Sequence, residues 1–244
     1  MSRLRVLSYN VHAWVDRDGR FDPERVLAVV ESARADVVCL QEVVLDPEND
    51  EPHHAPTLGE VSERLNMLAV PGPTLERKGA PYGNLLLSRF HVLGRRLVDI
   101  SHPGREPRGI IDVDLETPGG VLRVMTTHLG LSPVERTAQV RWLMEQVKAE
   151  SWPLVLCGDF NEWIPGRPGR MKRHFGSTPA PKTFPARLPM LALDRVWCRP
   201  RAILRNLEVM GGFEASRASD HRPLLADIDF ARLPAISPKA PLSP

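Results

Sequence analysis

The chain has 244 residues, of which 42% are hydrophobic, so it is long and apolar enough to bury a large core. Its formal charge of +2 is too small to demand a polyanionic partner, although a local basic patch can still attract a phosphate-bearing ligand. No segment resembles a signal peptide or reaches the ~20 apolar residues of a membrane span. The three cysteines are scattered among apolar residues, which is typical of reduced thiols in a core. We therefore expect a cytoplasmic protein.

Short apolar segments bounded by Gly, Pro or Asp are typical of strands, and the sequence contains nine of them. In chain order they are residues 4–9, 36–40, 84–88, 109–115, 121–127, 153–158, 193–198, 202–209 and 223–230. A helix is predicted after Asp22, which can cap it, with Pro23 at the first helical position. A second helix is predicted within residues 131–150, with Ser132 and Glu135 in a capping box. Its buried stripe comprises Val140, Leu143, Met144 and Val147.

Many strands with few helices between them predict an α/β (α+β) sandwich of two sheets with flanking helices. We expect residues 1–232 to form a single, monomeric domain. The Pro-rich residues 233–244 have little to bury and are expected to be an extended or disordered tail. The polar stretch 46–56 is expected to be a solvated loop, although its two histidines and its acids leave an additional metal site open.

Polar side chains stand at six of the predicted strand termini. They are Asn10, Glu42, His128, Asp159 with Asn161, Asp194, and Asp220 with His221. Each residue alone is equally typical of a turn, a surface acid or a buried core histidine. Six such termini together indicate a site assembled at one edge of a sheet, where rigid elements hold side chains from distant parts of the chain.

The residue types at these termini suit metal-assisted phosphate chemistry. Carboxylate and amide oxygens without cysteine favour a hard ion such as Mg²⁺ or Mn²⁺ over zinc. Such an ion neutralises and orients a phosphate, while a carboxylate beside an amide can hold and polarise a water. An aspartate paired with a histidine fixes the imidazole in one tautomer, ready to bind a phosphoryl oxygen or move a proton.

Seven motifs carry a family resemblance. "SYNVHAW", "LQEV", "YGNLLLSR", "THLG", "GDFNEW", "LDRVW" and "SDHRPL" resemble, in their order, the motifs of the endonuclease/exonuclease/phosphatase superfamily, which has the deoxyribonuclease I-like fold. The likeness runs from about Leu4 to Ile228. It implies a four-layer α/β/β/α sandwich, with two central mixed β-sheets between helices and a phosphoesterase site for Mg²⁺ or Mn²⁺ at one edge.

The resemblance also implies a role for each polar terminus. It implies metal-site residues at Asn10, Glu42 and Asp220, with Glu42 as the principal ligand. It implies a phosphate contact at His128 and a pair at Asp159 and Asn161 that holds the attacking water. It also implies that Asp194 is the acid that orients the catalytic His221. Whether His221 acts as base or as electrostatic clamp stays open. We favour Asp159 as the base and His221 as the group that binds phosphate and stabilises the transition state.

The substrate is less well defined by the sequence, because this fold serves many phosphoesters. The basic segment 166–176 includes Arg170 and Arg173, and Arg108 precedes a strand; all three are candidate phosphate contacts, with a solvated surface as the alternative. We expect a hydrolase of nuclease type acting on DNA or RNA. The alternatives are a phosphodiesterase or phosphatase for anionic phospholipids or small molecules, and a catalytically silent phosphate-binding module.

Overall fold

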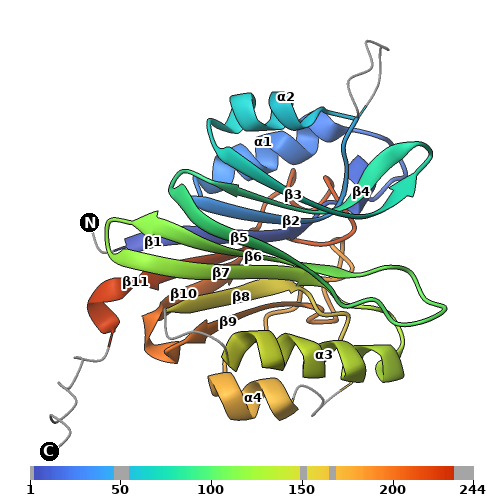
Figure 1. Ribbon diagram of the computed structural model, residues 1–244. Helices are drawn as coiled ribbons and strands as arrows, with labels where there is room; N and C mark the ends of the chain where they lie inside the picture. The colour runs from blue at the N-terminus through green and yellow to red at the C-terminus, as the bar shows by residue number, and fades with distance from the viewer. Residues whose placement is uncertain (1–2, 47–54, 149–152, 165–168, 234–244) are drawn as a thin grey trace, which may run out of the picture.

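Two mixed β-sheets pack face to face at the centre of the molecule, with helices on the outer face of each (Figure 1). The computed structural model describes residues 3–46, 55–148, 153–164 and 169–233. The first sheet has the strand order β10-β11-β1-β2-β4-β3, and the second has the order β5-β6-β7-β8-β9. The predicted four-layer α/β/β/α sandwich is therefore confirmed.

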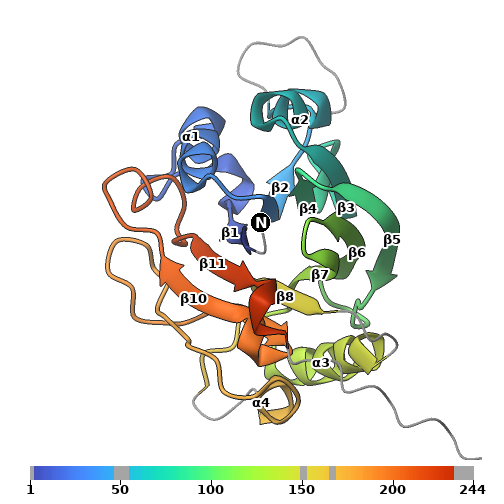
Figure 2. The same ribbon diagram turned by 90° about the vertical axis from the view of Figure 1, so that its left-hand side faces the viewer.

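The first sheet consists of β10 (Leu204–Val209), β11 (Leu224–Asp229), β1 (Arg3–Asn10), β2 (Val37–Val44), β4 (Ala80–Ser88) and β3 (Leu68–Arg77). The second consists of β5 (His91–Asp99), β6 (Gly109–Thr117), β7 (Gly120–His128), β8 (Leu154–Asp159) and β9 (Asp194–Arg199). Helices α1 (Pro23–Ala33) and α2 (Leu58–Leu65) cover the first sheet, and α3 (Pro133–Lys148) and α4 (Gly169–Phe175) cover the second. Figure 2 shows the same separation of the two helix pairs from a second direction.

Apolar side chains fill the three spaces between these four layers. Val6 and Leu86 of the first sheet meet Val124 and Val155 of the second in the central layer. The outer layers bury the helices against the sheets, and burial of this apolar surface is the main favourable contribution to folding. Within the described ranges, no helix combines the length and the apolar character that crossing a membrane requires.

The local signals for the two predicted helices have different outcomes. Asp22 caps α1 as expected, since its carboxylate accepts a hydrogen bond from the Arg25 backbone N–H at 3.0 Å. The predicted stripe of α3 packs on the second sheet. Neither hydrogen bond of the predicted capping box forms between Ser132 and Glu135 in the described part of the chain; the Glu135 side chain is instead buried and accepts a hydrogen bond from Gln139 Nε2 at 3.1 Å.

All nine predicted strands are present in the structure, whereas β3, β5, α2 and α4 were not predicted. The predicted basic loop at 166–176 is partly wrong, because residues 169–175 form α4. Arg167 in that segment, most of the polar stretch 46–56 and the tail beyond Leu233 lie outside the described residues.

Two parallel strand pairs bring the polar termini to one edge. Strands β1 and β2 run parallel in the first sheet, and β7 and β8 run parallel in the second. Parallel neighbours end at the same side of a sheet, where ligand sites of α/β proteins are commonly found. The two sheets therefore present the ends of four strands to one another.

Candidate active site

Strand register places three of the predicted site residues side by side. His128 ends β7 and pairs with Asp159 at the end of β8, and Asp159 pairs in turn with Asp194 at the start of β9. Side chains alternate between the faces of a strand, and Val155 and Cys157 of β8 point into the layer between the sheets. The side chain of Asp159 shares that face, so it points toward the first sheet.

Asn10 joins the two sheets at this point. Its Nδ2 donates to Glu42 Oε1 at 3.0 Å within the first sheet and to Asp159 Oδ2 at 3.1 Å in the second. Its Oδ1 accepts the backbone N–H of His12 at 3.0 Å, which fixes the orientation of the amide. One buried amide therefore holds two carboxylates next to each other, although two like charges at this separation repel.

A β-bulge aims Glu42 into the site. The pairing of β2 with β4 shifts between Leu40 and Val43, and Glu42 has a left-handed backbone with φ of 57°. Bulges redirect side chains, and a non-glycine residue with positive φ stores strain that the surrounding structure must offset. Burial works against ionisation of Glu42, but the interaction with His128 and the hydrogen bond from Asn10 lower its pKa below the ordinary value.

The turn after β8 fixes Asp159 and Asn161 together. The backbone N–H of Asn161 donates to Asp159 Oδ1 at 2.8 Å, and Asn161 has φ of 48°. Gly158 is required just before them, because a Cβ there would lie 1.9 Å from the backbone oxygen of Thr127. The Asn161 amide donates to Leu129 O at 2.9 Å and contacts His128 Nε2 at 3.0 Å.

His128 is held in its neutral form. Burial lowers its pKa, and the charges of Arg108 and His221 act in the same direction, whereas Asp159 and Glu42 oppose them. A neutral imidazole can offer Nε2 as the acceptor for the Asn161 amide. The Asp159 Oδ2 atom lies 3.6 Å from this nitrogen.

Asp194 and His221 form the second half of the site. Asp194 Oδ2 lies 2.8 Å from His221 Nδ1 and also accepts a hydrogen bond from Thr183 Oγ1 at 2.5 Å. His221 Nε2 is directed at Asp159 Oδ2, 3.6 Å away. Burial lowers the pKa of His221, but Asp194, Asp159 and Asp220 outweigh it and raise the pKa to about 10. The imidazole is therefore protonated at neutral pH.

The donor set fits a hard divalent cation. Glu42, Asp159 and Asp194 place three carboxylates in a largely buried space, and protonated His221 supplies one positive charge against them. Ligand atoms of Asp159, Asp194 and His221 lie within 4.8 Å of one another. Because a protonated imidazole cannot ligate a metal, the oxygens of Glu42 and Asp159 are better ligands than His221.

Asp220 is less closely integrated than the other predicted ligands. Its Oδ1 accepts a hydrogen bond from Ser219 Oγ at 3.3 Å and lies 3.8 Å from His12 Nδ1. Ser219 Oγ also donates to the Asn10 backbone oxygen at 2.8 Å, which ties this segment to the end of β1. Asp220 thus lies beside the cluster, and among the described residues it forms no hydrogen bond or ion pair with Glu42 or Asp159.

The three predicted arginines lie in different places. Arg108 is buried, donates to Glu106 Oε1 at 2.6 Å, and lies near enough to His128 to affect its pKa. Arg170 lines a cavity on the outer face of the second sheet, opposite the catalytic side chains. Arg173 is exposed on the same helix, α4. Only Arg108 is therefore brought to the cluster.

Sequence reasoning missed the groups that support Asp194 and His221. Thr183 bonds Asp194, and the Phe184 ring lies 4.9 Å from the His221 ring between centroids. Both belong to an irregular segment before β9 that carries no motif, so only tertiary structure reveals them. Ser219 does stand in the "SDH" motif, which was a usable signal.

Comparisons with known proteins agree with this geometry. The model of the family described as Endonuclease/Exonuclease/phosphatase family matches residues 7–221. The uncharacterised protein YbhP of Escherichia coli strain K12 is 30% identical, over 92% of this chain and 96% of that protein. The solved endonuclease/exonuclease/phosphatase structure from Beutenbergia cavernae is 25% identical, with a TM-score of 0.71 over 94% of this chain and 72% of its own. The one from Bacteroides vulgatus is 16% identical, with a TM-score of 0.74 over 94% of this chain and 99% of its own.

Proposed function

Because the chain belongs to the endonuclease/exonuclease/phosphatase family, we propose that it is a divalent-metal-dependent phosphoesterase that hydrolyses a phosphodiester bond in DNA or RNA. Members of this family are generally phosphoesterase hydrolases. The observation that carries the proposal is the alignment of Asp194, His221 and Asp159, in which a carboxylate-bound imidazole faces a second carboxylate. This arrangement sets a proton donor opposite a proton acceptor.

Asp159 is the proposed general base. Its Oδ1 is occupied by the Asn161 backbone N–H, while Oδ2 faces the two histidines and the Asn10 amide. A water held by Asp159 and Asn161 can lose its proton to the carboxylate as it attacks phosphorus. A positioned base of this kind contributes typically about 10²–10⁴-fold to the rate.

His221 is the proposed electrostatic stabiliser. Its Nδ1–H is committed to Asp194, so Nε2–H is the donor that remains for a phosphoryl oxygen. An imidazolium that carries its charge before the reaction needs no reorganisation as negative charge develops on the phosphate. The raised pKa of His221 supports this role over that of a base, which has to be unprotonated at the working pH.

Glu42 is the proposed principal metal ligand, with Asn10 and Asp220 beside it. A divalent ion held by these residues would neutralise phosphate charge and stabilise the leaving oxygen. His128 and Arg108 are proposed to contact the phosphate, since both lie at the same edge and Arg108 has an Nε without a hydrogen-bond partner among the described residues. Arg170 and Arg173 remain proposed contacts for a longer polyanionic substrate.

Exposed apolar side chains favour a second candidate, a phospholipid phosphodiesterase. Five apolar side chains in connections outside the helices and strands are each more than half exposed, namely Leu131, Trp163, Leu188, Met190 and Phe213. Leu131 follows His128 by three positions, and Trp163 follows Asn161 by two. Exposed apolar groups around a charged site fit an amphipathic substrate at a lipid surface.

A substrate panel distinguishes these functions. With Mg²⁺ or Mn²⁺, the purified protein is tested on single- and double-stranded DNA, RNA, cyclic dinucleotides, phosphatidylinositol, cardiolipin and sphingomyelin. Cleavage of DNA or RNA that EDTA abolishes supports the nuclease, and cleavage of lipids alone supports the second candidate. Binding of phosphate esters without turnover of any substrate would identify a silent binding module and overturn both.

A further inference from the structure

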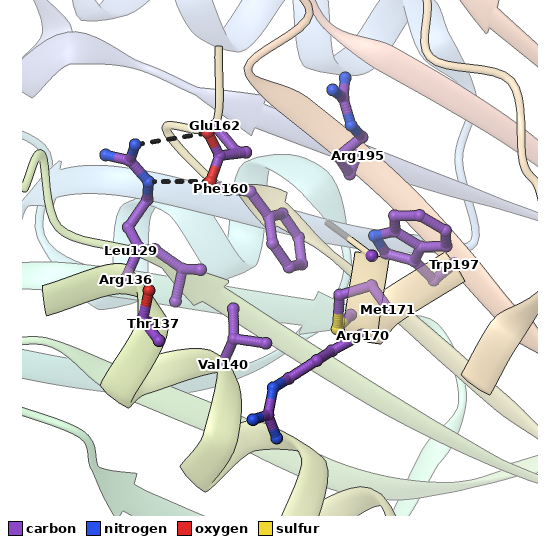
Figure 3. Close-up of a pocket in the computed structure, with 11 residues that line it drawn as sticks. Leu129, Arg136, Thr137, Val140, Phe160, Glu162, Arg170, Met171, Arg195 and Trp197 are labelled. Carbon is purple, nitrogen blue, oxygen red and sulfur yellow. Dashed lines mark hydrogen bonds and ion pairs between the residues drawn. The ribbon is translucent and has the colours of Figure 1, made fainter. Parts of the chain in front are cut away.

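A cavity of about 250 Å³ lies between α3, α4 and the outer face of the second sheet (Figure 3). Its apolar lining comes from Leu129, Val140, Phe160, Met171 and Trp197. These side chains stand on the face opposite the catalytic ones, because neighbouring residues of a strand alternate between the faces. The cavity is therefore separate from the phosphate site.

The cavity contains a buried donor without a partner. Trp197 is 2% exposed, and its Nε1 has no hydrogen-bond partner among the described residues. Figure 3 shows this nitrogen on the side of the indole that faces Phe160, across the cavity. An unsatisfied buried N–H is costly, so an acceptor in the cavity would be stabilised there.

The charges around the cavity favour an anion. Arg136 is paired with Glu162, both of whose oxygens lie 3.4 Å from its guanidinium nitrogens. Arg170 and Arg195 also line the cavity, and in the described part of the chain neither has a carboxylate within ion-pairing distance. In Figure 3 the Arg195 and Arg170 side chains start on either side of Trp197, and their guanidinium groups extend away from the indole toward opposite ends of the cavity. Burial lowers the pKa of Arg195. The negative charges of Asp194, Glu162 and Asp159 raise it, but by less, so the pKa stays below its ordinary value.

A second cavity of about 230 Å³ adjoins the first and shares Glu162, Arg195 and Trp197 with it. Its lining adds the Lys172 ammonium and Thr178, whose hydroxyl is also buried without a partner. Two unsatisfied hydrogen-bonding groups and a third cation thus line two adjoining cavities. Such a space, with a few convergent polar groups, is the usual form of a small-molecule site.

We propose that this space binds an apolar carboxylate. The apolar body packs against Leu129, Val140 and Phe160, while the carboxylate accepts the Trp197 Nε1–H in the positive field of Arg195 and Arg170, which line the same cavity. A neutral apolar molecule would leave the charge of the partly buried Arg195 without a counterion in the cavity. A phosphate ester without an apolar body would leave the lining unfilled.

The site is coupled to the catalytic residues through the backbone. Leu129 follows His128, Phe160 lies between Asp159 and Asn161, and Arg195 follows Asp194. An occupant therefore contacts side chains whose neighbours carry the proposed chemistry. The binding itself is independent of the proposed function, because it is measured without substrate or metal; only an effect on turnover rests on that function.

Calorimetry of the full chain with sodium octanoate tests the proposal, with octan-1-ol and sodium acetate as probes that lack the charge or the apolar body. We expect octanoate to bind about tenfold more tightly than octan-1-ol, the amount expected for a charge-assisted hydrogen bond, and acetate not to bind. Arg170→Gln should weaken octanoate binding about tenfold. Arg173→Gln, on the same helix but outside the cavity lining, should leave it unchanged.

Three results would each overturn the proposal. They are the absence of octanoate binding, an affinity for octan-1-ol equal to that for octanoate, and equal effects of Arg170→Gln and Arg173→Gln on octanoate binding. Val140→Phe fills the cavity and should abolish binding while the circular dichroism spectrum is retained; should this variant not fold, the arginine pair decides. Backbone NMR shifts on adding octanoate locate the ligand. They should centre on Leu129, Phe160 and Trp197, and shifts confined to another surface would contradict the assignment.

Discussion

Asp194 Oδ2 lies 2.8 Å from His221 Nδ1, and this single contact determines which ring nitrogen of the imidazole is available to a substrate. Because Nδ1 is engaged, Nε2 is left to face Asp159 at 3.6 Å. The two carboxylates outweigh the effect of burial, so the pKa of His221 rises to about 10. Asp194 therefore controls both the orientation and the charge of His221.

The first prediction concerns this charge. In metal-free buffer with EDTA, the ¹⁵N-labelled imidazole of His221 should titrate near pH 10, well above its ordinary 6.5. Asp194→Asn keeps a group of similar shape but removes the negative charge, so it should lower this pKa toward the ordinary value. A titration of His221 near pH 6.5 in the unmodified protein would show that burial outweighs the carboxylates.

The same shift predicts how stability depends on pH. The pKa of His221 is higher in the folded protein than in the unfolded chain, so protonation of His221 stabilises the fold. This contribution is complete below about pH 6.5, the pKa in the unfolded chain, and is lost as the pH rises to about 10, the pKa in the folded protein. In that window the free energy of unfolding should fall by about 1.4 kcal/mol per pH unit from this group. Urea denaturation at a series of pH values measures it. In His221→Gln this part of the slope should disappear; an identical slope in both proteins argues against the linkage.

Turnover provides the third prediction. His221→Ala removes the proposed donor to phosphate and should reduce kcat by at least about 100-fold. His91→Ala, an exposed histidine on the edge strand β5, is the matched control and should retain full activity. Both variants should show thermal unfolding close to that of the unmodified protein at pH 10, where most of the His221 stabilisation has already been lost. Full activity of His221→Ala would remove His221 from the mechanism.

Metal binding provides the fourth prediction, which needs no substrate. Mg²⁺ or Mn²⁺ should raise Tm, because a ligand that binds only the folded state stabilises it by mass action. Glu42→Gln keeps the hydrogen bond to Asn10 within reach but removes the charge, so it should weaken apparent metal affinity by at least about tenfold. Glu116→Gln, an exposed acid on β6, is the control. A metal-dependent Tm shift that is unchanged in Glu42→Gln would exclude Glu42 as the principal ligand.

Most of the nine predicted strands could be recognised because they are buried on at least one face and therefore form nearly continuous apolar runs, whereas the largely exposed β10 was recognised only from its alternating aliphatic residues. Two of the four edge strands, β3 and β5, were not predicted. β3 contains Pro71, Gly72 and Pro73, which are strand breakers that an edge tolerates, and β5 alternates exposed and half-buried residues around Gly94. Helix α2 did carry a signal, the capping box of Thr57 and Glu60, but it has only eight residues.

The site residues could be predicted because each ends or begins a strand in a recognisable motif. Their geometry could not be predicted. The bulge that aims Glu42 depends on its register with β4, and the contacts of Thr183 and Phe184 depend on an irregular segment folding back over His221. Likewise, Arg170 follows the "GDFN" motif by few residues, yet α4 places it beneath the second sheet. Proximity in sequence to a catalytic motif did not mean proximity in space.

The last prediction concerns Arg136, which links the two loops that follow His128 and Asn161. This arginine is 2% exposed and donates to the backbone oxygens of Gly130 and Leu131 as well as to Glu162. Arg136→Met leaves these acceptors unpaired, so urea denaturation should show a loss of about 3 kcal/mol.

Activity should also fall in Arg136→Met, because the freed loops carry the backbone next to His128 and Asn161. Arg141→Met, an exposed position on the same helix α3, is the matched control for both measurements. The double variant Arg136→Met with Glu162→Leu removes both charges and should be less destabilised than the sum of the two single variants, since neither charge is then left buried alone. Strict additivity would mean that the two side chains do not act as a pair.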